Sequence, residues 1–206
     1  MTGSTNIIRT LRDLIPRRAL TWNEAERLTE LQANRLRELL GIEGARLPEE
    51  AVSGLPRIEV QRDFEMPVSG LASWGSGKWE IVLNASEPYG RQRFSLLHEL
   101  KHVIDHTTKQ YLYVPGVRSS EEKAERLADY FAACALMPKR HVKRLFGERQ
   151  SVTELALSFD VTPRAVAVRL NQLGLTGPVR RCNRPLPAVY RPEIYERSLS
   201  LHGVAA

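Results

Sequence analysis

The pentapeptide His98-Glu99-Leu100-Lys101-His102 is the feature that most constrains the fold of this chain. The pattern of apolar residues around it predicts a helix over 91–106. Residues four apart on an α-helix project to nearly the same side, so the two imidazoles can bind one tetrahedral zinc ion. Glu99 then faces the same cleft, where it can take a proton from zinc-bound water and deliver it to a leaving amine. The other positions of the helix are apolar, which predicts that it packs inside the protein.

The third ligand of such a site must come from another part of the chain. A catalytic zinc usually has three protein ligands, but the position six after His102, where an extended motif has histidine, is Thr108. The helix predicted after Ser119 offers four carboxylates: Glu121, Glu122, Glu125 and Asp129. We interpret Glu125 as the ligand. Asp129, four residues further on the same face, is then the hydrogen-bond acceptor of a ligand histidine. Glu121 and Glu122 are expected on a solvated face.

Predicted strands and helices occupy separate parts of the chain, which indicates an α+β fold. Thr21 and Glu24 have the spacing of a capping box, which predicts a helix over 22–40, and a loop is expected over 44–55. Strand-like runs follow at 57–61, 70–74 and 78–83. The turn residues Gly75-Ser76-Gly77 predict that the last two form a hairpin. Further helices are predicted over 124–136, 139–146, 152–159 and 163–173, and 109–117 is ambiguous. We expect a short antiparallel sheet beside the helices that carry the site.

The last two predicted helices have the apolar layout of a helix-turn-helix. Thr162 followed by Pro163 is an N-cap with proline at the first helical position. A DNA-reading version would carry polar or basic side chains at the start of its second helix, and this chain has Arg164 there, with Arg169 later. We favour a unit that packs on the core or docks a protein; DNA binding is an alternative that we do not favour.

Two motifs taken together resemble the ImmA/IrrE family of zinc metallopeptidases. The first is the run RFSLLHELKH at 93–102, and the second is ERLADYFAA at 125–133, followed by Leu136-Met137-Pro138. Ala135 stands where the family pattern often has leucine. The resemblance covers 59–175. It implies a zincin-like domain of the gluzincin kind, with zinc bound by His98, His102 and Glu125 and with Glu99 as general base. It also implies that the substrate is an Xre-type helix-turn-helix repressor, whose cleavage derepresses genes.

Four segments follow from these patterns. We expect an N-terminal helical segment over 1–56 and a zincin-like metallopeptidase core over 57–148. A helix-turn-helix-like helical part over 149–176 and a proline-containing tail over 177–206 complete the chain.

The composition of the chain bears on its partners and its cellular location. The net charge of +6 and pI of about 9.6 are compatible with acidic partners, but the basic residues are spread along the chain, which favours an arginine-rich surface. No apolar run approaches the roughly 20 residues of a membrane span, and the first residues lack the apolar block of a secretory signal. The two cysteines, Cys134 and Cys182, have no CxxC partner. We therefore expect a cytoplasmic protein without a membrane partner.

Two functions remain open at this point. One is a zinc endopeptidase, for which Tyr130 is a candidate stabiliser of the oxyanion that forms during peptide hydrolysis. The other is a non-catalytic, metal-containing regulator that binds protein or DNA. A fourth protein ligand, such as His106 or Asp129, would close the metal site and favour the second function.

Overall fold

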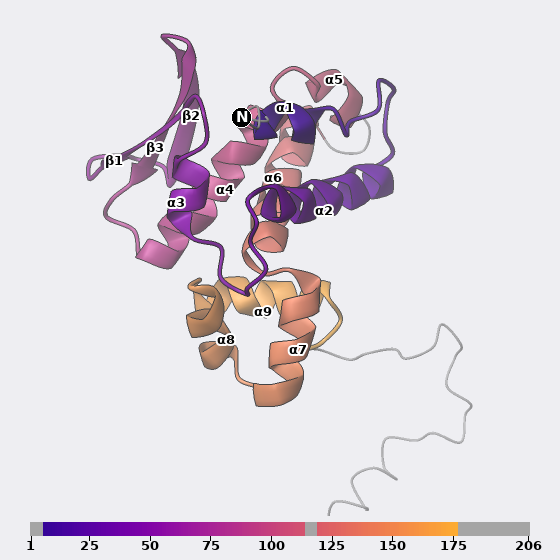
Figure 1. Cartoon of the computed structure of the whole chain (residues 1–206), viewed down its shortest axis with the longest axis vertical. Helices are drawn as coiled ribbons and strands as arrows, with labels where there is room; N and C mark the ends of the chain where they lie inside the picture. The colour runs from indigo at the N-terminus through magenta and orange to yellow at the C-terminus, as the bar shows by residue number, and fades with distance from the viewer. Residues whose placement is uncertain (1–5, 114–118, 177–206) are drawn as a thin grey trace, which may run out of the picture.

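The computed structural model describes residues 6–113 and 119–176. It places a small sheet to one side of three longer helices, with three short helices below them (Figure 1). The elements in chain order are α1 Ile7–Arg12, α2 Trp22–Leu39, α3 Glu49–Ser53, β1 Ile58–Asp63, β2 Gly70–Gly75, β3 Lys78–Asn84, α4 Tyr89–Asp105, α5 Lys109–Leu112, α6 Ser120–Leu136, α7 Lys139–Arg149, α8 Val152–Phe159 and α9 Pro163–Gln172. The predicted α+β class is confirmed. The predicted tail over 177–206 lies outside the described residues.

The sheet has the strand order β1-β3-β2, so β2 is an edge strand. The predicted hairpin is confirmed: β2 and β3 are antiparallel, and Ser76 and Gly77 in the turn have φ values of 51° and 77°. The prediction of a purely antiparallel sheet is wrong, because β1 pairs with β3 in parallel. The connection over 64–69 carries the chain from β1 to the opposite edge of the sheet. As a result β1 and β3 run in the same direction and the sheet is mixed.

One face of the sheet packs on the helices. The parallel register sets Val60 beside Ile81, and the hairpin register sets Ala72 on the other side of Ile81. Ile81 and Leu83 are fully buried, whereas Gln61, on the opposite face, is exposed. This alternation is the period-two pattern of a half-buried strand, and it fixes which residues of β2 face α4.

Helix α4 packs against β2 and β3, α6 packs against α4, and α2 packs against α6 (Figure 1). The starts of α2 and α6 carry the Thr and Ser caps that the sequence predicts. Thr21 makes both bonds of its capping box with Glu24, and the Ser119 hydroxyl accepts a hydrogen bond from the backbone N–H of Glu122. The interior residues of α4 are almost wholly buried: Leu96, Leu97, Leu100, Val103 and Ile104. The sequence prediction that the motif helix is internal is therefore correct.

Two short helices were not predicted. The segment 44–55, expected to be a loop, contains α3, which begins after Pro48, has Glu49 and Glu50 in its first turn and buries Val52. Acidic residues near a helix N-terminus interact favourably with its dipole, but five residues are too few to show a period in the sequence. Within the ambiguous stretch 109–117, residues Lys109–Leu112 form α5.

The helices α7, α8 and α9 pack onto the ends of α4 and α6 that lie nearest to them (Figure 1). The buried guanidinium of Arg93 on α4 donates to the backbone carbonyls of Phe159, at 2.9 Å, and Asp160. The buried Arg169 of α9 donates through Nε to the carbonyl of Met137, at 3.1 Å. A Cβ added at Gly90, in the first turn of α4, would lie only 3.0–3.1 Å from the backbone of Val161 and Thr162. The helix-turn-helix-like part is thus tied directly to the helix that carries the motif.

One hydrophobic cluster contains described residues from the first three of the four predicted segments. It contains Leu11 from the N-terminal helices, Leu97 from the motif helix and Phe159 from the helix-turn-helix-like part. The boundaries proposed at 56 and 148 stay predictions. None of the helices in the described ranges combines the length and the apolar composition that a membrane crossing requires.

Candidate metallopeptidase active site

Three side chains from two helices converge on one point. Nε2 of His98 lies 3.1 Å from Nε2 of His102, and the two carboxylate oxygens of Glu125 lie 3.2 Å from the first and 3.3 Å from the second. The two histidines are one turn apart on α4, and Glu125 comes from α6, which packs alongside. Sequence spacing brought the histidines together, and the packing of the two helices brought the carboxylate to them.

This donor set fits a zinc ion. Ligands at about 2.0–2.1 Å in a tetrahedron lie about 3.3 Å from one another. The two imidazole nitrogens have close to this separation, and so has each imidazole nitrogen from its nearer Glu125 oxygen, while donor atoms taken one from each of the three residues lie within 4.8 Å of one another. Two imidazole nitrogens and one carboxylate oxygen are also the ligand types of known catalytic zinc sites. The His98 and His102 side chains are 16% and 22% exposed, but the Glu125 side chain is 63% exposed. The point between them is therefore open to solvent on the Glu125 side.

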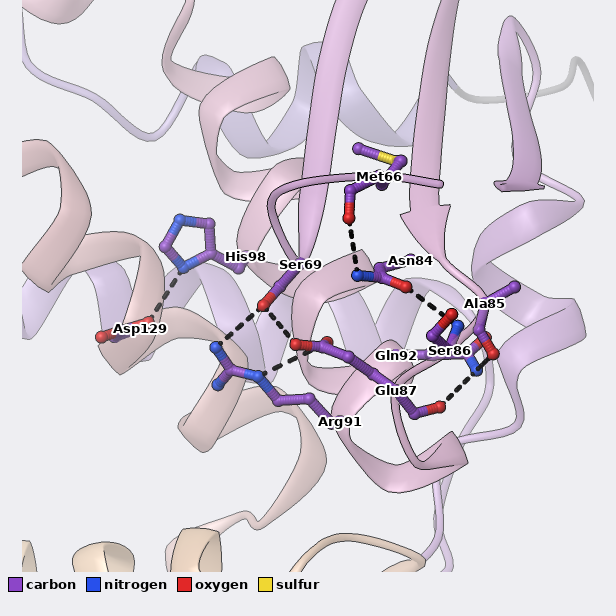
Figure 2. Close-up of polar contacts among 10 residues, drawn as sticks. All are labelled: Met66, Ser69, Asn84, Ala85, Ser86, Glu87, Arg91, Gln92, His98 and Asp129. Atoms are coloured by element: carbon purple, nitrogen blue, oxygen red, sulfur yellow. Dashed lines mark hydrogen bonds and ion pairs between the residues drawn. The ribbon is translucent and has the colours of Figure 1, made fainter. Parts of the chain in front are cut away.

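Asp129 supports the first histidine. Its Oδ1 lies 2.9 Å from Nδ1 of His98, so the imidazole can donate from Nδ1 and keep the lone pair of Nε2 for a metal (Figure 2). Burial disfavours the charged imidazole, but the hydrogen bond and charge of Asp129, together with the charges of Glu99 and Glu125, raise the pKa of His98. Burial and the neighbouring His98 lower the pKa of His102. The sequence prediction placed Asp129 in this supporting position.

Glu99 lies between the histidines and the edge strand. Burial and the charge of Glu125 raise the pKa of its carboxyl group, while the backbone N–H of Ala72 on β2 hydrogen-bonds to it and acts in the opposite direction. A raised pKa suits a group that must accept a proton and later release it. A Cβ added at Gly70 would lie 3.2 Å from Cγ of Glu99 and 3.3 Å from its Oε1, so β2 approaches this side chain closely.

A network of hydrogen bonds fixes the start of β2 (Figure 2). The Asn84 side chain donates to the carbonyl of Met66 at 3.0 Å, and the Ser69 hydroxyl donates to Glu87 at 2.7 Å. Arg91 in turn donates to the Ser69 hydroxyl at 3.2 Å and pairs with Glu87 at 3.7 Å. Because these contacts hold the residues just before Gly70, they set the distance between the edge strand and Glu99.

The triad and Glu99 line a cleft of about 550 Å³. The remaining lining residues are Val68, Ser69, Gly70, Leu71, Arg91, Phe94, Ser95 and Asp129. Sequence reasoning missed the roles of Arg91, Ser69, Gly70 and Ala72. The glycine that opens a predicted strand was the one signal that could have pointed to a close approach.

Other residues considered in the sequence analysis lie outside the candidate metal site. The ring of His106 packs edge-on against Trp79, with centroids 5.0 Å apart, and is not part of the metal-binding cluster found in the described residues. Glu121 and Glu122 are exposed, as expected. Tyr130 does not line the cleft: its hydroxyl donates to Glu30 on α2 at 3.2 Å, so it is not placed to stabilise an oxyanion there.

The comparisons with known proteins agree with this geometry. The profile of the IrrE N-terminal-like domain, a peptidase family, matches residues 58–171. A solved structure of a Mycobacterium tuberculosis transcriptional regulator superposes with a TM-score of 0.55 and 19% sequence identity, covering 85% of this chain. This chain covers only 54% of that structure, and at this identity the likeness concerns the fold alone. Among curated proteins, none matched the chain.

The profile spans the sheet, both helices that meet at the cleft, and the helices α7 to α9, and it thus covers more than half of the sequence. Its match includes every residue of the candidate triad and Glu99. The chain therefore belongs to the ImmA/IrrE family, whose IrrE N-terminal-like domain is a peptidase domain.

Proposed function

We propose that this chain is a zinc-dependent endopeptidase whose substrate is a helix-turn-helix repressor of the Xre type. The observation that carries the proposal is the convergence of His98, His102 and Glu125, each pair of which approaches to 3.1–3.3 Å, with one side open and Glu99 beside it. The substrate class rests on the family resemblance.

Different side chains of the site have different roles in peptide hydrolysis. His98, His102 and Glu125 would hold a zinc ion, which would supply Lewis acidity and lower the pKa of a bound water. Glu99 accepts the proton of the attacking water and returns it to the nitrogen of the leaving amine, which its burial and raised pKa favour. Asp129 keeps the His98 ring oriented and its Nε2 available.

The edge strand supplies a means to align the substrate. Because β2 pairs with β3 on one side only, backbone groups on its other edge can bond to an extended peptide. Gly70 and Leu71 of this strand line the cleft, so a peptide added there would pass beside Glu99. Backbone pairing of this kind accepts many sequences, and side-chain contacts must then provide the specificity.

A closed metal site would favour the non-catalytic alternative, and the geometry of the described residues does not support one. Asp129 is engaged with His98 Nδ1 rather than with the metal position, and His106 packs on Trp79. Among the described residues the cluster has three ligands, which leaves a position for water.

The test compares the unaltered chain with Glu99→Ala on a purified Xre-type repressor, with added zinc and with a chelator. Mass spectrometry of the products is the measurement. We expect cleavage at a defined bond by the zinc-loaded unaltered chain alone, while Glu99→Ala still binds about one zinc per chain. Equal loss of intact repressor with both proteins would defeat the proposal. Zinc content measured with His98→Ala as control tests the metal site separately.

A further inference from the structure

A second hollow adjoins the catalytic cleft. It has a volume of about 690 Å³ and shares three lining residues with the cleft: Arg91, Phe94 and Asp129. The other residues of this hollow, called the α9 groove below, are Trp22, Glu26, Pro88, Arg126, Tyr130, Ala133, Thr162, Arg164, Ala165, Val168 and Gln172. The cleft and the α9 groove therefore adjoin at these three residues, so a chain bound in the cleft can reach the groove.

The helix α9 forms one wall of the groove with its exposed face. Arg164, Val168 and Gln172 are spaced four apart, so they share one side of the helix, and all three line the groove. In a DNA-reading helix-turn-helix, the first residues of this second helix would contact bases. In this protein, the first residues of α9 line the groove together with residues of α2 and α6. They therefore lie on the side of the molecule that carries the catalytic cleft.

The apolar part of the groove is exposed without a covering segment among the described residues. Val168 is 51% exposed, although it stands on a helix whose other apolar side is buried through Val166 and Leu170. Phe94 is half-buried at the boundary with the cleft. These side chains offer a site for one apolar residue of a bound peptide.

Three arginines surround this apolar part. Arg91 is held by Glu87 and Ser69, and Arg126 lies over the Trp22 ring at 5.2 Å while pairing with Glu122 at 4.0 Å. Arg164 is exposed, and its side chain makes no hydrogen bond or ion pair with any residue in 6–113 or 119–176. Of the two acids in the groove, Asp129 is already engaged with His98. The other acid is Glu26. Because Arg91 and Arg126 are already paired with Glu87 and Glu122, Arg164 is the arginine among the described groove residues that can pair with a carboxylate of a bound peptide.

We infer that the α9 groove binds the segment of the polypeptide substrate that flanks the scissile bond, and that it selects an apolar residue next to an acidic one. The apolar side chain packs against Val168 and Phe94, and the carboxylate pairs with Arg164. This inference rests on the proposed peptidase function, because it uses the continuity of the groove with the catalytic cleft. It assigns the helix-turn-helix-like part to substrate selection and not to DNA.

The test measures peptide binding apart from catalysis. The zinc-loaded full chain with Glu99→Ala is titrated into two fluorescein-labelled peptides that contain alternating apolar and charged residues. One peptide has glutamate at the charged positions and the other has lysine. Fluorescence anisotropy gives the dissociation constants. We expect the glutamate peptide to bind about tenfold more tightly, since Arg164 attracts its carboxylates and repels the ammonium groups of the lysine peptide.

Matched variants locate the contact. Arg164→Glu should weaken binding of the glutamate peptide about tenfold, and Arg17→Glu, the same change on an exposed loop outside both hollows, should not. Val168→Ser should weaken both peptides several-fold, whereas Leu157→Ser, at a 78% exposed position on α8 outside the groove, should not. Equal effects of the variant and its control in either pair, or no binding of either peptide, would overturn the inference.

Two further results distinguish failure of the proposed peptidase function from failure of the inference about the α9 groove. If the unaltered chain cleaves no repressor but the Arg164 dependence holds, the peptidase proposal fails and the groove stands as a peptide-binding site. If Arg164→Glu abolishes salt-sensitive binding of a labelled DNA duplex and leaves peptide binding unchanged, the helix contacts DNA and the inference is wrong.

Discussion

The carboxylate of Asp129 lies 2.9 Å from Nδ1 of His98, on the side of the ring opposite to the nitrogen that faces Glu125 and His102. One turn of α6 separates Asp129 from Glu125, so a single helix supplies both the carboxylate of the candidate triad and the support of its first histidine. The metal site thus depends on the rotation of α6 about its own axis relative to α4.

Asp129→Asn should weaken zinc binding about 10–100-fold, because the amide keeps the shape but loses the charge that holds the His98 ring and raises its basicity. Competition with a chromophoric chelator measures the affinity. Glu121→Gln, a matched change at an exposed residue of the same helix, is the control. An unchanged zinc affinity in Asp129→Asn would show that His98 does not rely on this contact.

Gly70→Val should reduce peptidase activity at least about tenfold without loss of bound zinc. An added Cβ lies 3.2 Å from Cγ of Glu99, tighter than ordinary contact, and the branched side chain would push the carboxylate or the strand. Gly75→Val at the other end of β2 meets nothing within 4 Å and serves as control. Activity and metal content are measured on the same preparation, and a fully active Gly70→Val chain would contradict the arrangement.

Gly90→Ala should destabilise the protein by about 1–3 kcal/mol, because the new methyl group meets the backbone of Val161 and Thr162 at 3.0–3.1 Å and backbone cannot rotate away. Gly147→Ala on α7 has no neighbour within 4 Å and should stabilise by up to about 1 kcal/mol through helix propensity. Urea unfolding followed by circular dichroism measures both. Two variants shifted in the same direction would refute the close docking of the helix-turn-helix-like part.

Alkaline pH should destabilise the protein through Cys134. Burial raises the pKa of this thiol to about 11 from its ordinary 9.0, so the unfolded chain releases the proton first. The stability linked to this group is complete below about pH 9 and is lost as the pH rises towards about 11. The free energy of unfolding should therefore fall by about 2 kcal/mol more in the unaltered chain than in Cys134→Ala over this window. Parallel pH profiles for the two proteins would contradict the prediction.

The sequence by itself determined the local features of the site. The spacing of His98 and His102 placed two imidazoles on one side of α4, and the spacing of Glu125 and Asp129 did the same on α6. The helix starts at Thr21 and Ser119 were also readable, because a cap and its partner lie three residues apart. All of these depend on contacts within about one helical turn, and such contacts follow from the helical period alone.

Only the tertiary structure decided which elements meet. The parallel pairing of β1 with β3, the approach of Gly70 to Glu99, and the turn of the Tyr130 hydroxyl towards Glu30 join residues far apart in the chain. The exposed face of α9 likewise lines the groove beside the cleft, and the buried Arg93 and Arg169 tie its unit to α4 and to the end of α6. Such contacts form where apolar faces are buried and buried hydrogen-bond donors find acceptors, and both depend on the packing of the whole molecule. The periodicity of a local stretch of sequence does not predict them.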